Sequence, residues 1–401
     1  MANTPLKRWE TSTSTGSHFD VLDGIRGLAI LLVVSFHSLY TNPTHGELAR
    51  VAGYIISAGW MGVPVFFVLS GFLISYPFFQ RRATHPQAWY VPGYARRRMG
   101  KILPPFYLSI IIFIAFYWWQ FDDVAYLKSA WQLATGISYF KLMPTSPLFN
   151  AAYWSLYLES LFYLTLPFMF WLLRGRTVQT TTTILFLTIF CLAAVARHCA
   201  WLPNMWTLPG LENINLHRML WQEFSRFPCQ MDYFAWGIAF SGIYVVLKPV
   251  REHVRVLGLF GYVGTALLLA TLVLWGSWVD HYNLAAKPTR WSVEVSHLLP
   301  GLATMLMLFF VYDSQSLGAR IFSFQPLRFT GIISYEWFLF HLPVVSWFQD
   351  HYERPHGSIL AFVWRTIVPL VITYGLAVLV YRYFSLPILH RIRDRLKREA
   401  I

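Results

Sequence analysis

An arginine and a histidine, Arg26 and His37, stand eleven positions apart within one apolar segment of the 401-residue chain. Eleven steps of about 100° return an α-helix to within roughly 20° of its starting direction, so both side chains lie on one helix face. At about 1.5 Å rise per residue they are roughly 16 Å apart along the axis. Ionisable residues inside a membrane are costly, so the pair predicts a polar path through the protein rather than contact with lipid.

The two residue types suit different chemical tasks. A neutral imidazole titrates near pH ~6.5, so His37 could accept a proton from a hydroxyl and return it to a leaving group. Arg26 keeps its charge and could hold an anionic group such as a phosphate. The alternatives are a helix-packing hydrogen bond for His37, and a snorkelling side chain or an ion pair with Asp23 for Arg26.

Further polar residues recur at helical spacing. Ser155, Glu159 and Tyr163 form one stripe on an otherwise apolar helix. A carboxylate inside the membrane needs a partner, and we expect an Arg or His of the bundle to supply it for Glu159. Ser334 and His341 are seven positions apart and share a face, with Tyr335 beside them. Several such groups converging in one bundle would indicate a site.

Four cations, Arg96, Arg97, Arg98 and Lys101, precede another apolar segment. They could signal topology alone, or they could bind the phosphates of a nucleotide-like ligand. Ser70-Gly71 lies in an apolar run, where small residues permit close helix approach. Ser70 is not part of a G-x-S-x-G motif, so a hydrolase triad is unsupported.

The elements that must position these residues are transmembrane helices. The chain is 56% hydrophobic and only 13% charged, whereas soluble proteins carry about 25% charged residues. We expect an all-α fold, a polytopic membrane helix bundle of about ten transmembrane helices. The expected spans are 21–41, 54–79, 102–120, 151–173, 182–201, 229–247, 256–275, 296–312, 329–348 and 360–383.

The net charge of +13 is distributed in alternate loops, which argues for membrane topology rather than nucleic-acid binding. Basic loops of membrane proteins lie on the cytoplasmic side, so we expect both termini in the cytoplasm. The expected location is the inner (plasma) membrane. We divide it into a disordered tail 1–18, a membrane domain 19–384 and a basic cytoplasmic tail 385–401 that could contact anionic lipid. Stretches 121–150, 202–228 and 276–295 are expected outside. The three cysteines form neither a disulfide framework nor a metal site.

Taken together, these residues resemble the acyltransferase 3 family of integral membrane acyltransferases. The resemblance runs from about 19 to 384 and is carried most specifically by the Arg-x10-His spacing of Arg26 and His37. The blocks that match are LDGIRGLA at 22–29, FFVLSGF at 66–72, RRMGKILP at 97–104, WSL at 154–156 with Glu159, Phe162 and Tyr163, and ISY at 333–335 with His341. Lys101, Glu336 and Phe340 depart from the usual pattern, and the last two could mark an altered acceptor pocket. No SGNH-type domain follows, so the chain resembles the stand-alone branch.

The resemblance implies transfer of an acyl group, expected to be acetyl, from acyl-CoA to a hydroxyl of a carbohydrate or natural product. His37 would act as general base, Arg26 would orient the donor and Glu159 would orient or charge-balance these groups. The residues expected to hold the acyl-CoA are Arg97, Arg98, Lys101, Ser334, Tyr335 and His341. Acyl-CoA would be a co-substrate, with no bound cofactor or metal; an acyl-histidine intermediate is a less economical route.

Two other classes stay open at this stage. A transporter or flippase of an anionic metabolite would also place charges at mid-membrane, although no internal repeat is evident. A membrane sensor or scaffold would need none of these side chains for chemistry. The acceptor, the acyl chain length, the membrane face of the acceptor site and the oligomeric state are not determined by the sequence.

Overall fold

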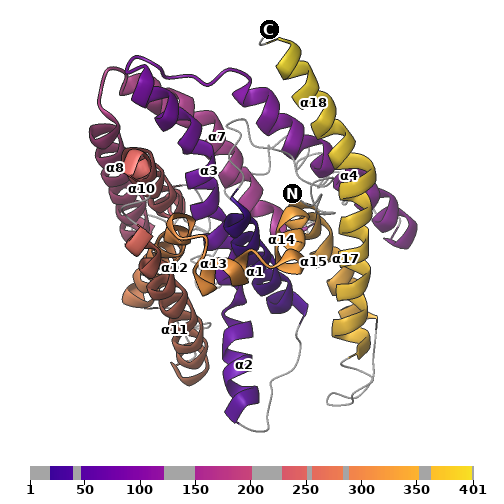
Figure 1. The fold of residues 1–401 in the computed structure, drawn as a ribbon. Helices are drawn as coiled ribbons and strands as arrows, with labels where there is room; N and C mark the ends of the chain where they lie inside the picture. The colour runs from indigo at the N-terminus through magenta and orange to yellow at the C-terminus, as the bar shows by residue number, and fades with distance from the viewer. Residues whose placement is uncertain are drawn as a thin grey trace, which may run out of the picture.

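The computed structural model describes residues 19–38, 47–121, 150–200, 228–250, 255–282, 289–351 and 363–399. Within these ranges every regular element is a helix, so the expected all-α fold is confirmed (Figure 1). Nine helical segments of the described ranges are long and apolar enough to cross a membrane. The protein is therefore a multi-pass membrane protein. The expected tail 1–18 and nearly all of the stretches 121–150 and 202–228 lie beyond the described residues. Of the stretch 276–295 only 283–288 lies beyond them, and most of its other residues belong to the helices Leu259–Tyr282 and Arg290–Met307.

The α-helices are α1 Asp20–Ser38, α2 Glu47–Ser57, α3 Gly62–Thr84, α4 Tyr94–Phe121, α7 Trp154–Leu172, α8 Val178–Ala200, α10 Met231–Leu247, α11 Leu259–Tyr282, α12 Arg290–Met307, α13 Leu317–Phe322, α14 Gln325–Ile332, α15 Ser334–Asp350, α17 Val368–Val380 and α18 Leu386–Arg398. Short 3₁₀ turns join several of them, among them η2 Gly59–Met61 and η6 Leu308–Tyr312. The π-helical turns η7 Val363–Ile367 and η8 Tyr381–Ser385 flank α17.

Two of the ten expected spans differ from the structure. Segment 54–79 divides into the end of α2, the turn η2 and α3, so the expected span began in the wrong helix. Segment 329–348 is broken at Ile333 into α14 and the 17-residue α15. A hydropathy window averages over many residues and does not register a break at one backbone position. This break matters, because it places the first turn of α15 inside the bundle.

The basic segment 96–101 is also helical rather than a loop, because α4 begins at Tyr94. The expected tail from 385 onward continues from α17 through η8 into α18, which lies beside α4 (Figure 1). Its apolar residues pack on two glycines of this region: a Cβ at Gly100 would lie 2.0 Å from Ile392 Cδ1, and one at Gly93 2.8 Å from Leu396 Cδ2. The apolar side of α18 therefore covers α4.

Small residues allow the central helices to approach closely. A Cβ at Gly71 of α3 would lie 2.3 Å from the Phe234 carbonyl oxygen of α10, and one at Gly237 2.1 Å from the Val68 oxygen. This confirms the close approach predicted from Ser70-Gly71. Helix α14 crosses α1 in the same way, since a Cβ at Gly27 would lie 2.1 Å from the Leu327 oxygen.

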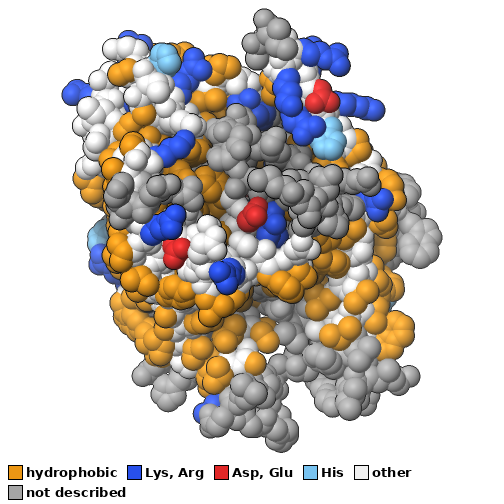
Figure 2. Space-filling model, in the orientation of Figure 1, with side chains coloured by type: hydrophobic (Ala, Val, Ile, Leu, Met, Phe, Trp, Pro, Cys, Tyr) orange, Lys and Arg blue, Asp and Glu red, His pale blue; other side chains and the backbone are white. Residues whose placement is uncertain are grey.

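The surface divides into two zones in Figure 2. Lys and Arg side chains gather in the upper part, over α18 and the neighbouring helix ends, whereas the lower body exposes mainly hydrophobic side chains. Exposed apolar residues such as Leu164, Val371 and Leu187 are 75%, 66% and 52% accessible. Such a surface is stable when lipid covers it, which agrees with the transmembrane assignment.

Candidate active site

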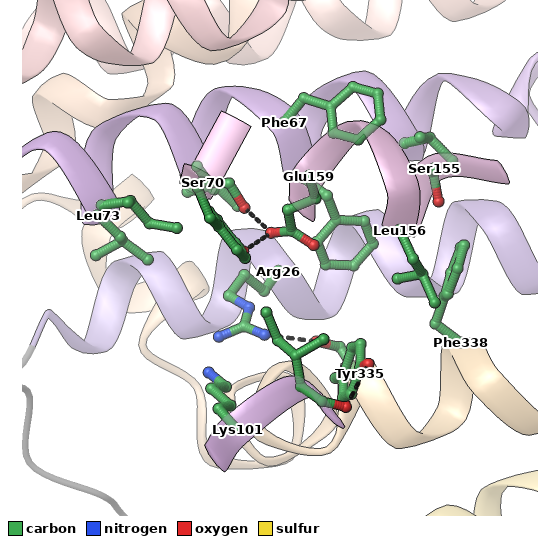
Figure 3. Close-up of a pocket in the computed structure, with 17 residues that line it drawn as sticks. Arg26, Phe67, Ser70, Leu73, Lys101, Ser155, Leu156, Glu159, Tyr335 and Phe338 are labelled. Atoms are coloured by element: carbon green, nitrogen blue, oxygen red, sulfur yellow. Dashed lines mark hydrogen bonds between the residues drawn. The ribbon is translucent and has the colours of Figure 1, made fainter. Parts of the chain in front are cut away.

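A cavity of about 90 Å³ lies between α1, α3, α4, α7 and α15 (Figure 3). Its apolar lining comes chiefly from α3 and includes Phe66, Phe67 and Leu73. Its polar lining comes from all five helices and comprises Arg26, Ser70, Lys101, Ser155, Glu159, Tyr163, Ser334 and Tyr335. The cavity therefore gathers residues that are up to 312 positions apart in the chain, Arg26 and Phe338.

Glu159 lies at the centre of the α7 side of this cavity. Ser70 and Tyr163 both donate hydrogen bonds to the same carboxylate oxygen, Oε1. We expected an Arg or His side chain to pair with Glu159, and this prediction is wrong. Hydroxyl groups are the hydrogen-bond donors to the carboxylate instead. The stripe of Ser155, Glu159 and Tyr163 faces the cavity as its spacing predicted. Among the described residues no hydrogen bond reaches the second oxygen, Oε2, which could accept one from a bound molecule.

The opposite wall carries two cations. Arg26 Nη2 donates to the Ser334 Oγ at 3.2 Å, and Lys101 lies beside Arg26 (Figure 3). Among the described residues, neither cation has a carboxylate within the 4.0 Å of an ion pair. The cavity thus holds two basic side chains that no carboxylate of the described residues contacts.

The break at Ile333 positions the rest of this wall. It turns the first residue of α15, Ser334, toward Arg26, and the Tyr335 hydroxyl donates to the Ile102 carbonyl at 2.9 Å. That bond ties α15 to α4 next to Lys101. The N-terminus of a helix carries a partial positive charge, so it adds to the two cations.

His37 does not line this cavity. It lies in the last turn of α1, with Nδ1 2.9 Å from the Val33 carbonyl oxygen and 3.1 Å from His341 Nε2. Arg26 and His37 therefore both face α15, meeting Ser334 and His341 respectively. The spacings of eleven on α1 and seven on α15 correctly predicted these shared faces.

The expected site residues thus fall into three places. Arg26, Glu159, Lys101, Ser334 and Tyr335 line the cavity. His37 and His341 form a pair farther along the same two helices. The two remaining cations, Arg97 and Arg98, do not line the cavity. The Arg98 guanidinium is 6.0 Å from the Tyr163 ring, and Arg97 donates to the Pro92 carbonyl at 2.8 Å.

Sequence reasoning missed a second buried charged group. Arg197 of α8 contacts Asp232 of α10 at 2.9 Å and Glu294 of α12 at 2.9 Å. His297 lies 3.3 Å from the second Asp232 oxygen. Arg197 sits at the end of an apolar segment, where it resembles an ordinary flanking cation, so no local pattern distinguishes it. Among the described residues no group of three His, Cys, Asp or Glu side chains could hold a metal ion.

A family model described as an acyltransferase domain, acyltransferase 3, matches residues 19–382. The chain is 24% identical over 384 residues to peptidoglycan O-acetyltransferase OatA of Listeria monocytogenes, covering 92% of this chain and 55% of that protein. It is 22% identical over 386 residues to O-acetyltransferase OatA of Staphylococcus aureus, covering 92% and 56%.

The chain thus spans about half the length of these relatives. No solved structure matches it significantly. The family match covers nearly all of the membrane helices and every residue of the cavity. The chain therefore belongs to the acyltransferase 3 family of integral membrane acyltransferases.

Proposed function

We propose that this protein is an O-acyltransferase that moves an acyl group, with acetyl as the first candidate, from acyl-CoA to a hydroxyl of a carbohydrate or glycosylated natural product. Two similar proteins are named O-acetyltransferases, one of them for peptidoglycan. The observation that carries the donor assignment is the pair of cations in the cavity, Arg26 and Lys101. Their charge calls for an anionic ligand, and CoA supplies phosphates.

The distance along α1 between Arg26 and His37 supports acyl-CoA as the donor. His37 is eleven helical positions after Arg26, or roughly 16 Å along the axis. A donor whose anionic end is held at Arg26 must therefore present its reactive group at some distance from it. CoA carries its thioester on a long flexible pantetheine arm, which suits that separation.

In the proposed reaction His37 acts as general base. It takes the proton of the acceptor hydroxyl as that oxygen attacks the thioester carbonyl. The C–S bond breaks, and the proton passes from the imidazolium to the thiolate, giving an ester and CoA thiol. Glu159 would orient the bound molecules through its second carboxylate oxygen. Direct transfer needs no covalent enzyme intermediate, whereas an acyl-histidine route would need a second step.

Sidedness is part of the proposal. We place the α18 end of the bundle, with both chain termini, in the cytoplasm at the inner membrane, because basic side chains gather there (Figure 2). CoA is cytoplasmic, and Arg97, Arg98 and Lys101 in the first turns of α4 belong to that end. They would guide the anionic donor toward the cavity.

The test is release of CoA thiol from acetyl-CoA by purified protein in lipid, with a glycan mixture as acceptor. We compare wild type with His37→Gln, with Arg26→Met, and with Arg320→Met as a control for loss of an exposed cation. His37→Gln should lower kcat by about 10²- to 10⁴-fold, and Arg26→Met should raise the KM for acetyl-CoA. Equal rates in wild type and His37→Gln would reject the base. Movement of an intact anionic metabolite across vesicles, without thiol release, would favour a transporter.

A further inference from the structure

We infer that His341 is a positioning residue that fixes the tautomer and ring orientation of His37, so that His37 Nε2 is the basic atom. This inference rests on the proposed role of His37. From the sequence we expected His341 to contact acyl-CoA. We now infer a different role for it, because His341 is fully buried and does not line the cavity.

The hydrogen bonds of the two rings fix where the protons lie. His341 Nδ1 is 2.9 Å from the Phe338 carbonyl oxygen and 3.2 Å from that of Trp337. A carbonyl can only accept, so His341 Nδ1 carries the proton and Nε2 of the neutral ring has a lone pair. His37 Nδ1 faces the Val33 carbonyl at 2.9 Å, so it too carries a proton.

In the hydrogen bond between the two rings, His37 is therefore the donor and His341 the acceptor. His37 Nδ1–H is shared between the Val33 oxygen and His341 Nε2, at 3.1 Å. The remaining basic atom of the pair is His37 Nε2. A proton added there gives an imidazolium whose Nδ1–H still has its acceptors, whereas a proton on His341 Nε2 would oppose two N–H groups. The pair therefore directs an incoming proton to one nitrogen.

This arrangement differs from a His oriented by a carboxylate. No carboxylate of the described residues lies within ion-pairing distance of either imidazole. A neutral ring takes that place, which avoids burying a further negative charge. His341 is 0% exposed, and its ring is 5.7 Å from that of Phe338, a residue that lines the cavity. The same stretch of α15 thus shapes the cavity and holds the base.

The backbone of His37 is held as well. The carbonyls of a last helical turn lack partners within the helix. Gln349 Nε2 donates to the His37 carbonyl at 3.0 Å, and Thr366 Oγ1 donates to the Ser38 carbonyl at 3.1 Å. Residues of α15 and η7 thus hold the backbone at His37. The orientation of the His37 ring then depends on its hydrogen bond with His341.

Two similar substitutions separate this role from simple packing. In His341→Gln the side-chain amide reaches the position of Nε2 and can still accept from His37 Nδ1–H. In His341→Asn the shorter amide retains the bond toward the Phe338 carbonyl and withdraws from His37. We expect kcat to fall by about 10²-fold in His341→Asn and by less than about 10-fold in His341→Gln, with the KM for acetyl-CoA unchanged in both. His351→Gln, at the exposed end of α15, is the matched control.

Equal losses in the Asn and Gln variants, or a loss confined to the KM for acetyl-CoA, would overturn the inference. Imidazole ¹⁵N spectra of histidine-labelled protein test it without any activity, with the His37 signals assigned by their loss in His37→Gln. The expected wild-type state is a neutral ring with the proton on Nδ1, and its Nδ1 signal should move in His341→Asn. A wild-type His37 protonated on Nε2 would also contradict the inference. A protein with the expected spectra but no thiol release would contradict the proposed function instead.

Discussion

Two of the charged groups in this bundle, those around Arg197 and Arg26, show opposite ways of placing an arginine among membrane helices. Arg197, 1% exposed, meets Asp232, Glu294 and the Cys229 carbonyl, so three helix segments meet at a satisfied guanidinium. Arg26 lies half-buried at a cavity with a serine hydroxyl as its hydrogen-bond partner and Lys101 beside it. Complete pairing indicates a structural role, whereas cations facing a cavity without a contacting carboxylate indicate a place for a ligand.

The largest expected effect is on the structural arginine. Arg197→Met leaves Asp232 buried with His297 as its one remaining side-chain partner among the described residues. Breaking a buried pair costs about 3–5 kcal/mol. The expected result is a large fall in thermal stability in detergent or lipid, with acyl transfer lost through unfolding. Arg197→Met with wild-type stability would erase the distinction between the two groups.

Arg26→Met should lower donor binding without lowering stability. Removing a cation that no described carboxylate contacts should leave the melting temperature unchanged or higher, because repulsion of Lys101 is relieved. The specificity constant for acetyl-CoA should fall by about 10²-fold, equivalent to about 2.7 kcal/mol. The measurement pairs thermal unfolding with steady-state kinetics, and bound CoA should raise the melting temperature of wild type more than that of the variant.

Glu159→Gln sharpens the comparison within the cavity. The amide oxygen can still accept from Ser70 and Tyr163, so we expect a stability loss of only about 1 kcal/mol. Asp232→Asn, by contrast, removes the charge opposite Arg197 and should cost more than Glu159→Gln. Thermal unfolding of the two variants side by side is the check; equal losses would mean that Glu159 also has a mainly structural role.

The smallest effect is expected at the surface. Arg96 and Glu399 form an ion pair between α4 and α18, with both side chains 45% exposed. Exposed pairs contribute roughly 0.2–1 kcal/mol and are screened by salt. Arg96→Gln should therefore leave stability and transfer nearly unchanged, and any difference should vanish at high salt.

The residue types and spacings identified much of the cavity in advance. The stripe of Ser155, Glu159 and Tyr163 and the facing pairs on α1 and α15 all follow from helix periodicity, which is a local property. The hydroxyl partners of Glu159 and the pairing of Arg197 were not predictable in this way. Ser70 is 89 positions from Glu159, and Asp232 is 35 from Arg197.

The sequence by itself determined that this chain is a membrane helix bundle, which faces of its helices are polar, and which family it resembles. Composition and periodicity encode these properties residue by residue. Only the tertiary structure decided that the polar residues divide between a cationic cavity and a histidine pair. That division depends on where α15 begins after the break at Ile333 and on how glycine contacts set the helices against one another. Such contacts join residues far apart in the chain, so no local pattern contains them.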